Sequence, residues 1–165
     1  MAAPTVAALL DYETNLEDAL AGHFNNTLSG VQVLTPRILI GSAPILTTPR
    51  VTLSVQITGT NPNQTGTRSS DSSDYDSHKV GTVQVGATTR RDATGQSLGT
   101  LRGKCRQAML QATAALNSNT LPYYQVIILR EASTTSAANP ENDEIASLLT
   151  YNLEFYIKTD QWPAS

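Results

Sequence analysis

Apolar residues recur along this chain with two periods, one typical of helices and one typical of strands. Near the start, an apolar side chain at every third or fourth position predicts an amphipathic helix. Its apolar stripe is formed by Leu9, Tyr12, Leu16, Leu20 and Phe24. Thr14 and Glu17 have the spacing of a capping box, so the helix begins either there or earlier, at about Thr5. Its exposed side is predicted to be acidic, with Asp11, Glu13, Glu17 and Asp18.

Three strands are predicted next, with a long polar segment before the last of them. Residues 37–40, RILI, are apolar at consecutive positions, which indicates a strand covered on both faces. Residues 50–58 alternate strictly between apolar and polar side chains and residues 83–88 alternate again, so the two are predicted to form a hairpin. The polar segment 58–79 between them has Tyr75 as its only aromatic residue. We expect this hairpin arm to stay mobile until a partner holds it.

A second helix and two more strands complete the pattern. The helix has several N-cap candidates within residues 92–97. Its apolar stripe is Leu98, Leu101, Cys105, Met109, Ala112 and Leu116. Residues 123–130 are apolar on both faces and predict a central strand. After a turn-rich loop at residues 139–142, the alternation over residues 149–157 predicts a closing strand.

The order of helix, three strands, helix and two strands predicts an α+β fold. We expect one domain over residues 1–165, in which a single twisted, mostly antiparallel β-sheet packs against two α-helices. The long β-hairpin arm at about residues 58–79 is predicted to project from that domain.

Composition narrows the function classes. Only 15% of the residues are charged and the net charge is −3, so the totals give no attraction to nucleic acid. The single cysteine, Cys105, excludes an intramolecular disulfide and a multi-cysteine zinc site, and it favours a reducing cytosol. The sequence predicts no secretory signal in residues 1–30 and no membrane span, so we expect a soluble protein made inside a cell.

No motif predicts a catalytic, cofactor or metal site. The segment GTLRGKC, Gly99–Cys105, is one residue shorter than a phosphate-binding loop and lies within the second helix. Cys105 belongs to an apolar stripe and is predicted to be a core residue rather than a nucleophile. His23 lies near the end of the first helix and His78 lies in the polar arm, which makes a poor metal site. Three aspartates of the arm resemble a calcium loop only loosely; they are Asp71, Asp74 and Asp76.

Charge is distributed unevenly along the chain. A basic cluster surrounds the start of the second helix, and it consists of Arg90, Arg91, Arg102, Lys104 and Arg106. Only Asp92 opposes it locally in the sequence, whereas the first helix and residues 141–144 are acidic. One interpretation is an ordinary solvated helix face. The other is that basic and acidic surfaces of neighbouring copies meet in a ring.

Four segments together resemble a known family. They are the flanks of the polar arm, VTLSVQITGT and VGTVQVGATTRRD, the helix SLGTLRGKCRQAMLQA, and the ending LTYNLEFYIKTDQWP. In their order they are similar to the tail terminator, or tail-completion, proteins of tailed bacteriophages. The amphipathic closing strand that ends in Trp-Pro is the most recognisable of them.

This resemblance implies a non-enzymatic structural protein of the virion neck, without a cofactor, assembled in the cytoplasm of a bacterial host. It implies a hexameric ring that caps the tail tube protein and joins it to head–tail connector or adaptor proteins, with a sheath if the tail is contractile. DNA would only pass through the channel. The arm is expected to face neighbouring subunits or the tube. The candidate interface residues are Arg68, Tyr75, Lys79, Arg90, Arg91, Arg102, Lys104, Arg106 and Trp162.

Three alternatives stay open. The chain could be a head-completion or tail-tube protein of a phage, and a tube protein would polymerise into fibres instead of stopping at one ring. It could be a small hydrolase or nucleotide-binding enzyme whose site is assembled from dispersed residues. It could also be a peptide-binding module that uses an open sheet edge.

Overall fold

A computed structural model describes residues 5–36, 49–60, 78–92, 96–120, 123–139 and 143–157. The helices are α1 (Val6–Leu9), α2 (Tyr12–Thr27) and α4 (Gln96–Ala115), and one π-helical turn, η2 (Leu116–Thr120), continues α4. The strands are β1 (Gln32–Leu34), β2 (Arg50–Thr60), β3 (His78–Arg90), β4 (Tyr124–Asn139) and β5 (Glu144–Ile157).

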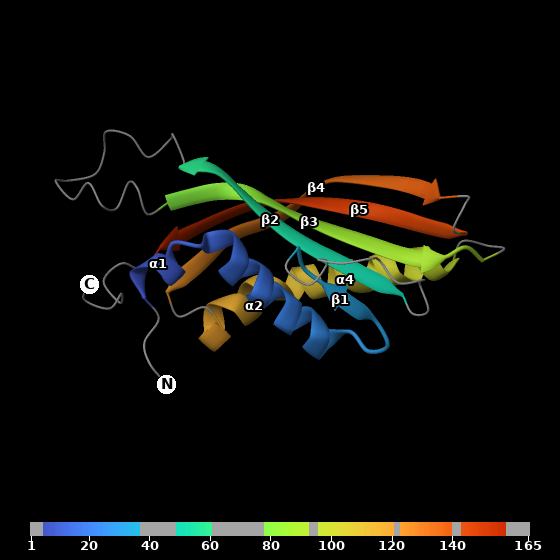
Figure 1. The fold of residues 1–165 in the computed structure, drawn as a ribbon, viewed down its shortest axis with the longest axis horizontal. Coiled ribbons are helices and arrows are strands. Elements are labelled where there is room, and N and C mark those ends of the chain that lie inside the picture. Colours follow the sequence, from blue (N-terminus) through green and yellow to red (C-terminus); the bar gives the residue numbers. More distant parts are fainter. Residues whose placement is uncertain are drawn as a thin grey trace.

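The five strands form one mixed sheet in the order β1-β2-β3-β5-β4. Only β1 and β2 are parallel; the other neighbours pair antiparallel. The helices lie together on one face of the sheet, α2 against β2 and α4 against β3 (Figure 1). The predicted α+β class, with a mostly antiparallel sheet and two packed helices, is confirmed.

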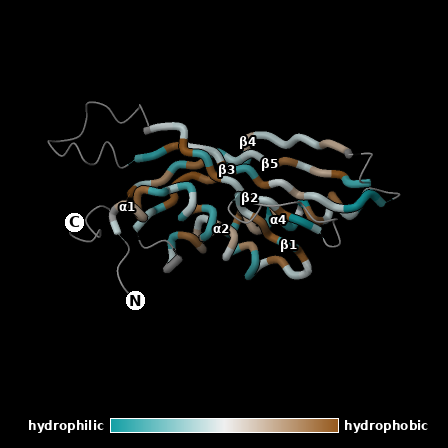
Figure 2. The backbone as a smooth tube through the Cα atoms, in the orientation of Figure 1, coloured by the Kyte–Doolittle hydropathy of each residue, from teal (hydrophilic) through white to brown (hydrophobic). Residues whose placement is uncertain are grey.

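The core lies between this sheet face and the helices. Alternate residues of a strand point to the same face, so the buried apolar positions of β2, β3 and β5 meet the helices, whereas Leu148 of β5 is exposed. The stripe of α4 is buried as predicted at Leu98, Leu101, Cys105, Met109 and Ala112, with Leu116 of η2. Hydrophobic colour gathers where helices and strands face one another, whereas the second half of β4 is pale (Figure 2).

An aromatic cluster ties the start of the chain to the end of the sheet. The Tyr124 hydroxyl donates to the Leu9 carbonyl oxygen and accepts from Nδ2 of Asn15 at 2.9 Å. Its ring packs edge-on against Tyr12 and Phe155, with centroids 6.1 and 5.7 Å away. Burial raises the pKa of Tyr124 to about 12. The cluster therefore fixes α1 and α2 on the same sheet face as α4.

Two strand predictions need correction. The sequence placed residues 123–130 in a central strand, but β4 is an edge strand and runs on to Asn139. A register shift between Val126 and Ile128 adds a residue to the strand, so consecutive apolar residues result from a bulge and not from two covered faces. Strand β1 was not predicted, and the predicted strand at residues 37–40 lies outside the described residues.

The predicted hairpin of β2 and β3 is confirmed, but its strands are longer than expected. The ends of the predicted arm, residues 58–60 and 78–79, belong to the paired strands, and residues 61–77 lie outside the described part. His78 was predicted to lie in the polar arm. It is instead buried, with Nε2 3.1 Å from Oε1 of Glu154 and its ring centroid 4.5 Å from that of Tyr156.

Gly81 is required where β2 changes register. The shift between Ile57 and Gly59 brings the β2 backbone over Gly81, and an added Cβ would lie 2.3 Å from the Gln56 carbonyl oxygen. That oxygen belongs to the backbone and cannot rotate away. A side chain at this position therefore has to displace a strand.

We predict that Gly81→Ala lowers the free energy of unfolding by about 1–3 kcal/mol, the usual cost of overpacking. Gly103→Ala is the control, because nothing lies within 4 Å of the added Cβ in α4. Alanine there should raise stability by up to about 1 kcal/mol. Urea denaturation measures both, and equal effects of the two substitutions would contradict the account of Gly81.

Candidate assembly interface

The two edges of the sheet differ in whether their backbone groups have partners. On the β2 side, partners within the subunit bind these groups, so this edge is closed. Strand β1 pairs with residues 50–52 of β2. Beyond β1, two carboxylates of α2 accept from the β2 backbone. Val55 N–H donates to Oε2 of Glu17 at 2.9 Å, and Ile57 N–H donates to Oε1 of Glu13 at 3.4 Å. The outward donors of these two residues are therefore used within the subunit.

Glu17 is buried, contrary to its predicted place on the exposed side of the first helix. Burial is the main cause that raises its pKa, and the neighbouring acids Asp18, Glu13 and Asp11 raise it further. The hydrogen bond from Val55 N–H lowers it only in part. The carboxyl group closes the edge at an electrostatic cost.

A raised carboxyl pKa means that the folded state binds the proton more tightly than the unfolded state. Stability is then lost as pH rises from the ordinary value of 4.5 through the raised folded value. Glu17→Gln keeps an acceptor oxygen without the charge. We predict that this variant is at least as stable as the wild type at neutral pH and loses less stability across that acidic window.

Glu17→Ala leaves Val55 N–H without its acceptor and should lower the free energy of unfolding by about 1–3 kcal/mol. Denaturation at several pH values compares the two variants. If Glu17→Gln proves as destabilising as Glu17→Ala at neutral pH, Glu17 does not act as an edge acceptor in the way described.

The β4 edge is closed only near its start. The side chain of Asn117 binds Val126 like a short strand: Oδ1 accepts from Val126 N–H, and Nδ2 donates to its carbonyl oxygen, both at 2.7 Å. Further along, residues 131–138 are all exposed, including both faces of the strand. We call residues 131–138 the open edge; they lie in the second half of β4, along the margin of the sheet (Figure 1).

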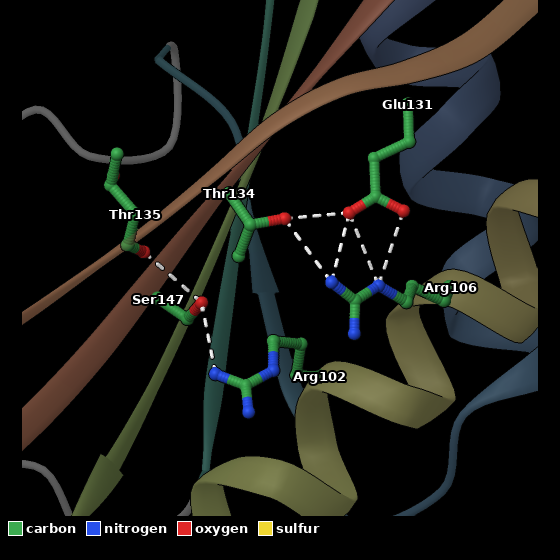
Figure 3. A network of polar contacts seen from close by, with 6 residues as sticks. All are labelled: Arg102, Arg106, Glu131, Thr134, Thr135 and Ser147. Atoms are coloured by element: carbon green, nitrogen blue, oxygen red, sulfur yellow. Dashed lines mark hydrogen bonds and ion pairs between the residues drawn. The ribbon is translucent and has the colours of Figure 1, made fainter.

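A polar network holds the open edge in shape (Figure 3). Nη2 of Arg106 in α4 lies 2.9 Å from Oε1 of Glu131 and donates to Oγ1 of Thr134 at 3.1 Å. The Thr134 hydroxyl donates to Oε1 of Glu131 at 2.6 Å. These contacts span the register shift between Glu131 and Ser133. The hydrogen bond from Arg106 is the main cause that lowers the pKa of Glu131.

A second tie lies one turn earlier on α4. Nη1 of Arg102 donates to Oγ of Ser147 at 3.4 Å, and that hydroxyl donates to the Thr135 carbonyl oxygen at 3.2 Å (Figure 3). Exposed ion pairs contribute little to stability, typically less than about 1 kcal/mol. The network therefore matters mainly for the shape of the strand.

The other predicted basic residues are differently placed. Arg90, Arg91 and Lys104 are exposed. Arg90 stands opposite Glu144 in the β3–β5 register. Asp92 is the only acidic residue that opposes the basic cluster locally in the sequence. Sheet pairing brings two further acidic residues to the cluster, Glu144 beside Arg90 and Glu131 beside Arg106.

Lys79 lies at the start of β3, with Nζ 6.0 Å from the ring centroid of Tyr12. The remaining candidates, Arg68, Tyr75 and Trp162, lie outside the described residues. Sequence reasoning missed the open edge, the edge acceptors Glu13 and Glu17, and Asn117. The sequence signal for the open edge was the uncharged run at residues 133–138. This run continues the strand that was predicted to end at residue 130.

The potentially reactive side chains of Cys105 and His23 have structural roles. Cys105 is fully buried, and burial raises the pKa of its thiol to about 12. His23 donates from Nε2 to the Ala108 carbonyl oxygen at 2.8 Å and so joins α2 to α4. Among the described residues, no group of three or more His, Cys, Asp or Glu side chains could hold a metal ion. In the same part of the chain, no helix is long and apolar enough to cross a membrane.

Comparisons with solved structures find distant similarities. No family model and no curated protein matches the chain. A solved structure of the virion of a native gene transfer agent particle contains a chain that is 14% identical, with a TM-score of 0.44. The alignment covers 83% of this chain and 84% of that chain. A TM-score this low does not establish a shared fold, so the match adds nothing to the geometry above.

Proposed function

We propose that this chain is a non-enzymatic structural subunit of a virion, and more specifically a tail terminator whose copies close into a ring on a tail tube. The open edge of β4 is the observation that supports this most strongly. Its eight exposed residues make an ordered polar surface, although the other edge is closed by β1, Glu13 and Glu17. Natural proteins usually block such edges, so an edge left open is suited to contact with another chain.

Charge supports contact between copies. Asp11, the N-cap of α2, and Asp18 within α2 are exposed, and Arg90 at the end of β3 and Arg91 directly after it are exposed as well. The start of α2 and the end of β3 lie toward opposite ends of the view (Figure 1). Head-to-tail contact brings unlike charges together, and a repeated contact of this kind forms a ring when its rotation closes.

The proposed partners follow from the resemblance of the sequence to tail terminators. They are other copies of this chain in a six-membered ring, the tail tube protein, connector or adaptor proteins of the neck, and a sheath if the tail is contractile. Duplex DNA only passes through. The weakly charged surface, with 15% charged residues in the whole chain, suits broad polar contacts.

Electron microscopy of the protein mixed with tail tubes tests this function. We expect one ring at a tube end and no growth beyond it. Long fibres of the protein alone would instead identify a tube subunit, as in the alternative interpretation. A protein that stays monomeric and leaves tube ends bare would contradict the proposal.

A charge exchange tests the head-to-tail contact. The variant Arg90→Glu/Arg91→Glu should not form rings because acidic surfaces meet, and Asp18→Lys should form fewer because basic surfaces meet. A mixture of the two variants should restore rings, since unlike charges then alternate around them. Rings formed equally well by each variant alone would show that these residues do not face one another across the contact.

A further inference from the structure

We propose that, before assembly, the open edge of β4 pairs with the open edge of a second copy of this chain. The contact is antiparallel and two-fold, and it joins two five-stranded sheets into one continuous sheet. This dimer is distinct from the proposed ring, because it is a state of the free protein before it binds a tail tube.

The pairing register identifies the backbone groups involved. Arg91 N–H donates to the Asp143 carbonyl oxygen, so odd-numbered residues of β5 face β3 and even-numbered residues face β4. Leu148, which is even-numbered, pairs with Thr135, so the backbone groups of Thr135 point inward. Those of Thr134, Ser136 and Ala138 consequently point outward. Val126 has the same parity, and its outward groups are the ones that Asn117 binds.

A strand is the natural partner for such a row of donors and acceptors. The hydrogen bonds that the described residues make outside the ladders use none of the backbone groups of Thr134, Ser136 or Ala138. They alternate along the edge as a neighbouring strand requires, at a separation of about 4.8 Å between strands. An added strand can bind them all at once.

The described strands of a second copy leave one suitable edge. Strand β1 has three residues, and β3 and β5 are interior. The β2 edge is occupied by Glu13 and Glu17. Strand β4 remains, and its outward residues can face their own equivalents because an antiparallel pair places equal parities opposite each other.

The side chains of this run are compatible with self-pairing. Residues 133–138, STTSAA, are small and uncharged, so no like charges and no bulky groups meet. With Ser136 opposite Ser136 of the second copy, Thr134 faces Ala138. Residues 131–138 also contain no proline or lysine, the residues that commonly block strand edges.

The polar network prepares the edge for pairing. Arg106, Glu131 and Thr134 hold the strand beyond its bulge, and Ser147 holds Thr135 from the inner side. Less conformational freedom is lost when an ordered strand pairs than when a mobile one does. The polar network thus fixes the shape of the open edge and leaves its outward backbone groups available.

Ser136→Pro tests the pairing, because it removes an outward N–H and leaves the inner ladder intact; proline is tolerated at such edge positions. Ser136→Ala is the matched control, since it removes the hydroxyl but keeps the N–H. Sedimentation equilibrium over a range of concentrations should show dimers for the wild type and Ser136→Ala. Two hydrogen bonds are lost per dimer, so Ser136→Pro should dissociate about tenfold more readily, or more.

A second variant distinguishes a lost contact from misfolding caused by proline. In Ser136→Lys two like charges meet at the two-fold axis, so its dimer should weaken at low salt and recover at high salt. A mixture with Ser136→Glu should form heterodimers. The proposal would be overturned by a wild type that is monomeric at every concentration, or by Ser136→Pro and Ser136→Lys variants that both dimerise like the wild type.

The test of edge pairing and the test of the terminator function can fail independently. If the free protein shows no edge-paired dimer but single rings still cap tubes, the terminator function stands and the pairing is wrong. If dimers form as predicted but tube ends stay bare, the pairing stands and the terminator function is wrong.

Discussion

Every strand of a sheet presents backbone donors and acceptors to both sides, and the two outermost strands must find partners for theirs. In this protein the β2 side is satisfied by β1 and then by Glu17 and Glu13. The β4 side is satisfied at Val126 by Asn117 and then left open. This asymmetry decides which surface of the subunit is available for assembly.

Closing one edge with a buried carboxylate carries an electrostatic cost. Glu17 keeps a raised pKa among acidic neighbours in order to accept from Val55 N–H, so ionising it opposes folding. The open edge is instead shaped by Arg106 and Arg102, which reach it from α4. A surface that is ordered beforehand but uses weak, exposed contacts can exchange one partner for another, which suits a subunit that is stored first and assembled later.

Much of the fold could be predicted from the periods of apolar residues, because α2, α4, β2 and β5 each bury one stripe. The prediction failed where a local feature overrode the period. The bulge at Ile127 imitated a doubly covered strand. The small residues 133–138 have no apolar–polar alternation and were left out of the predicted strand, although β5 holds them as strand. The basic cluster was found in the sequence, but its acidic partners Glu131 and Glu144 become neighbours only through sheet pairing.

Hydrogen exchange at single amides tests the central claim most directly. Amides of the open edge would be compared between the monomer and the assembled protein by quenched exchange and NMR. The account predicts that Thr134, Ser136 and Ala138 exchange rapidly in the monomer and become protected on assembly, whereas Thr135 and Ala137 are protected in both. Equal exchange of the three outward amides in the two states would show that no strand covers this edge.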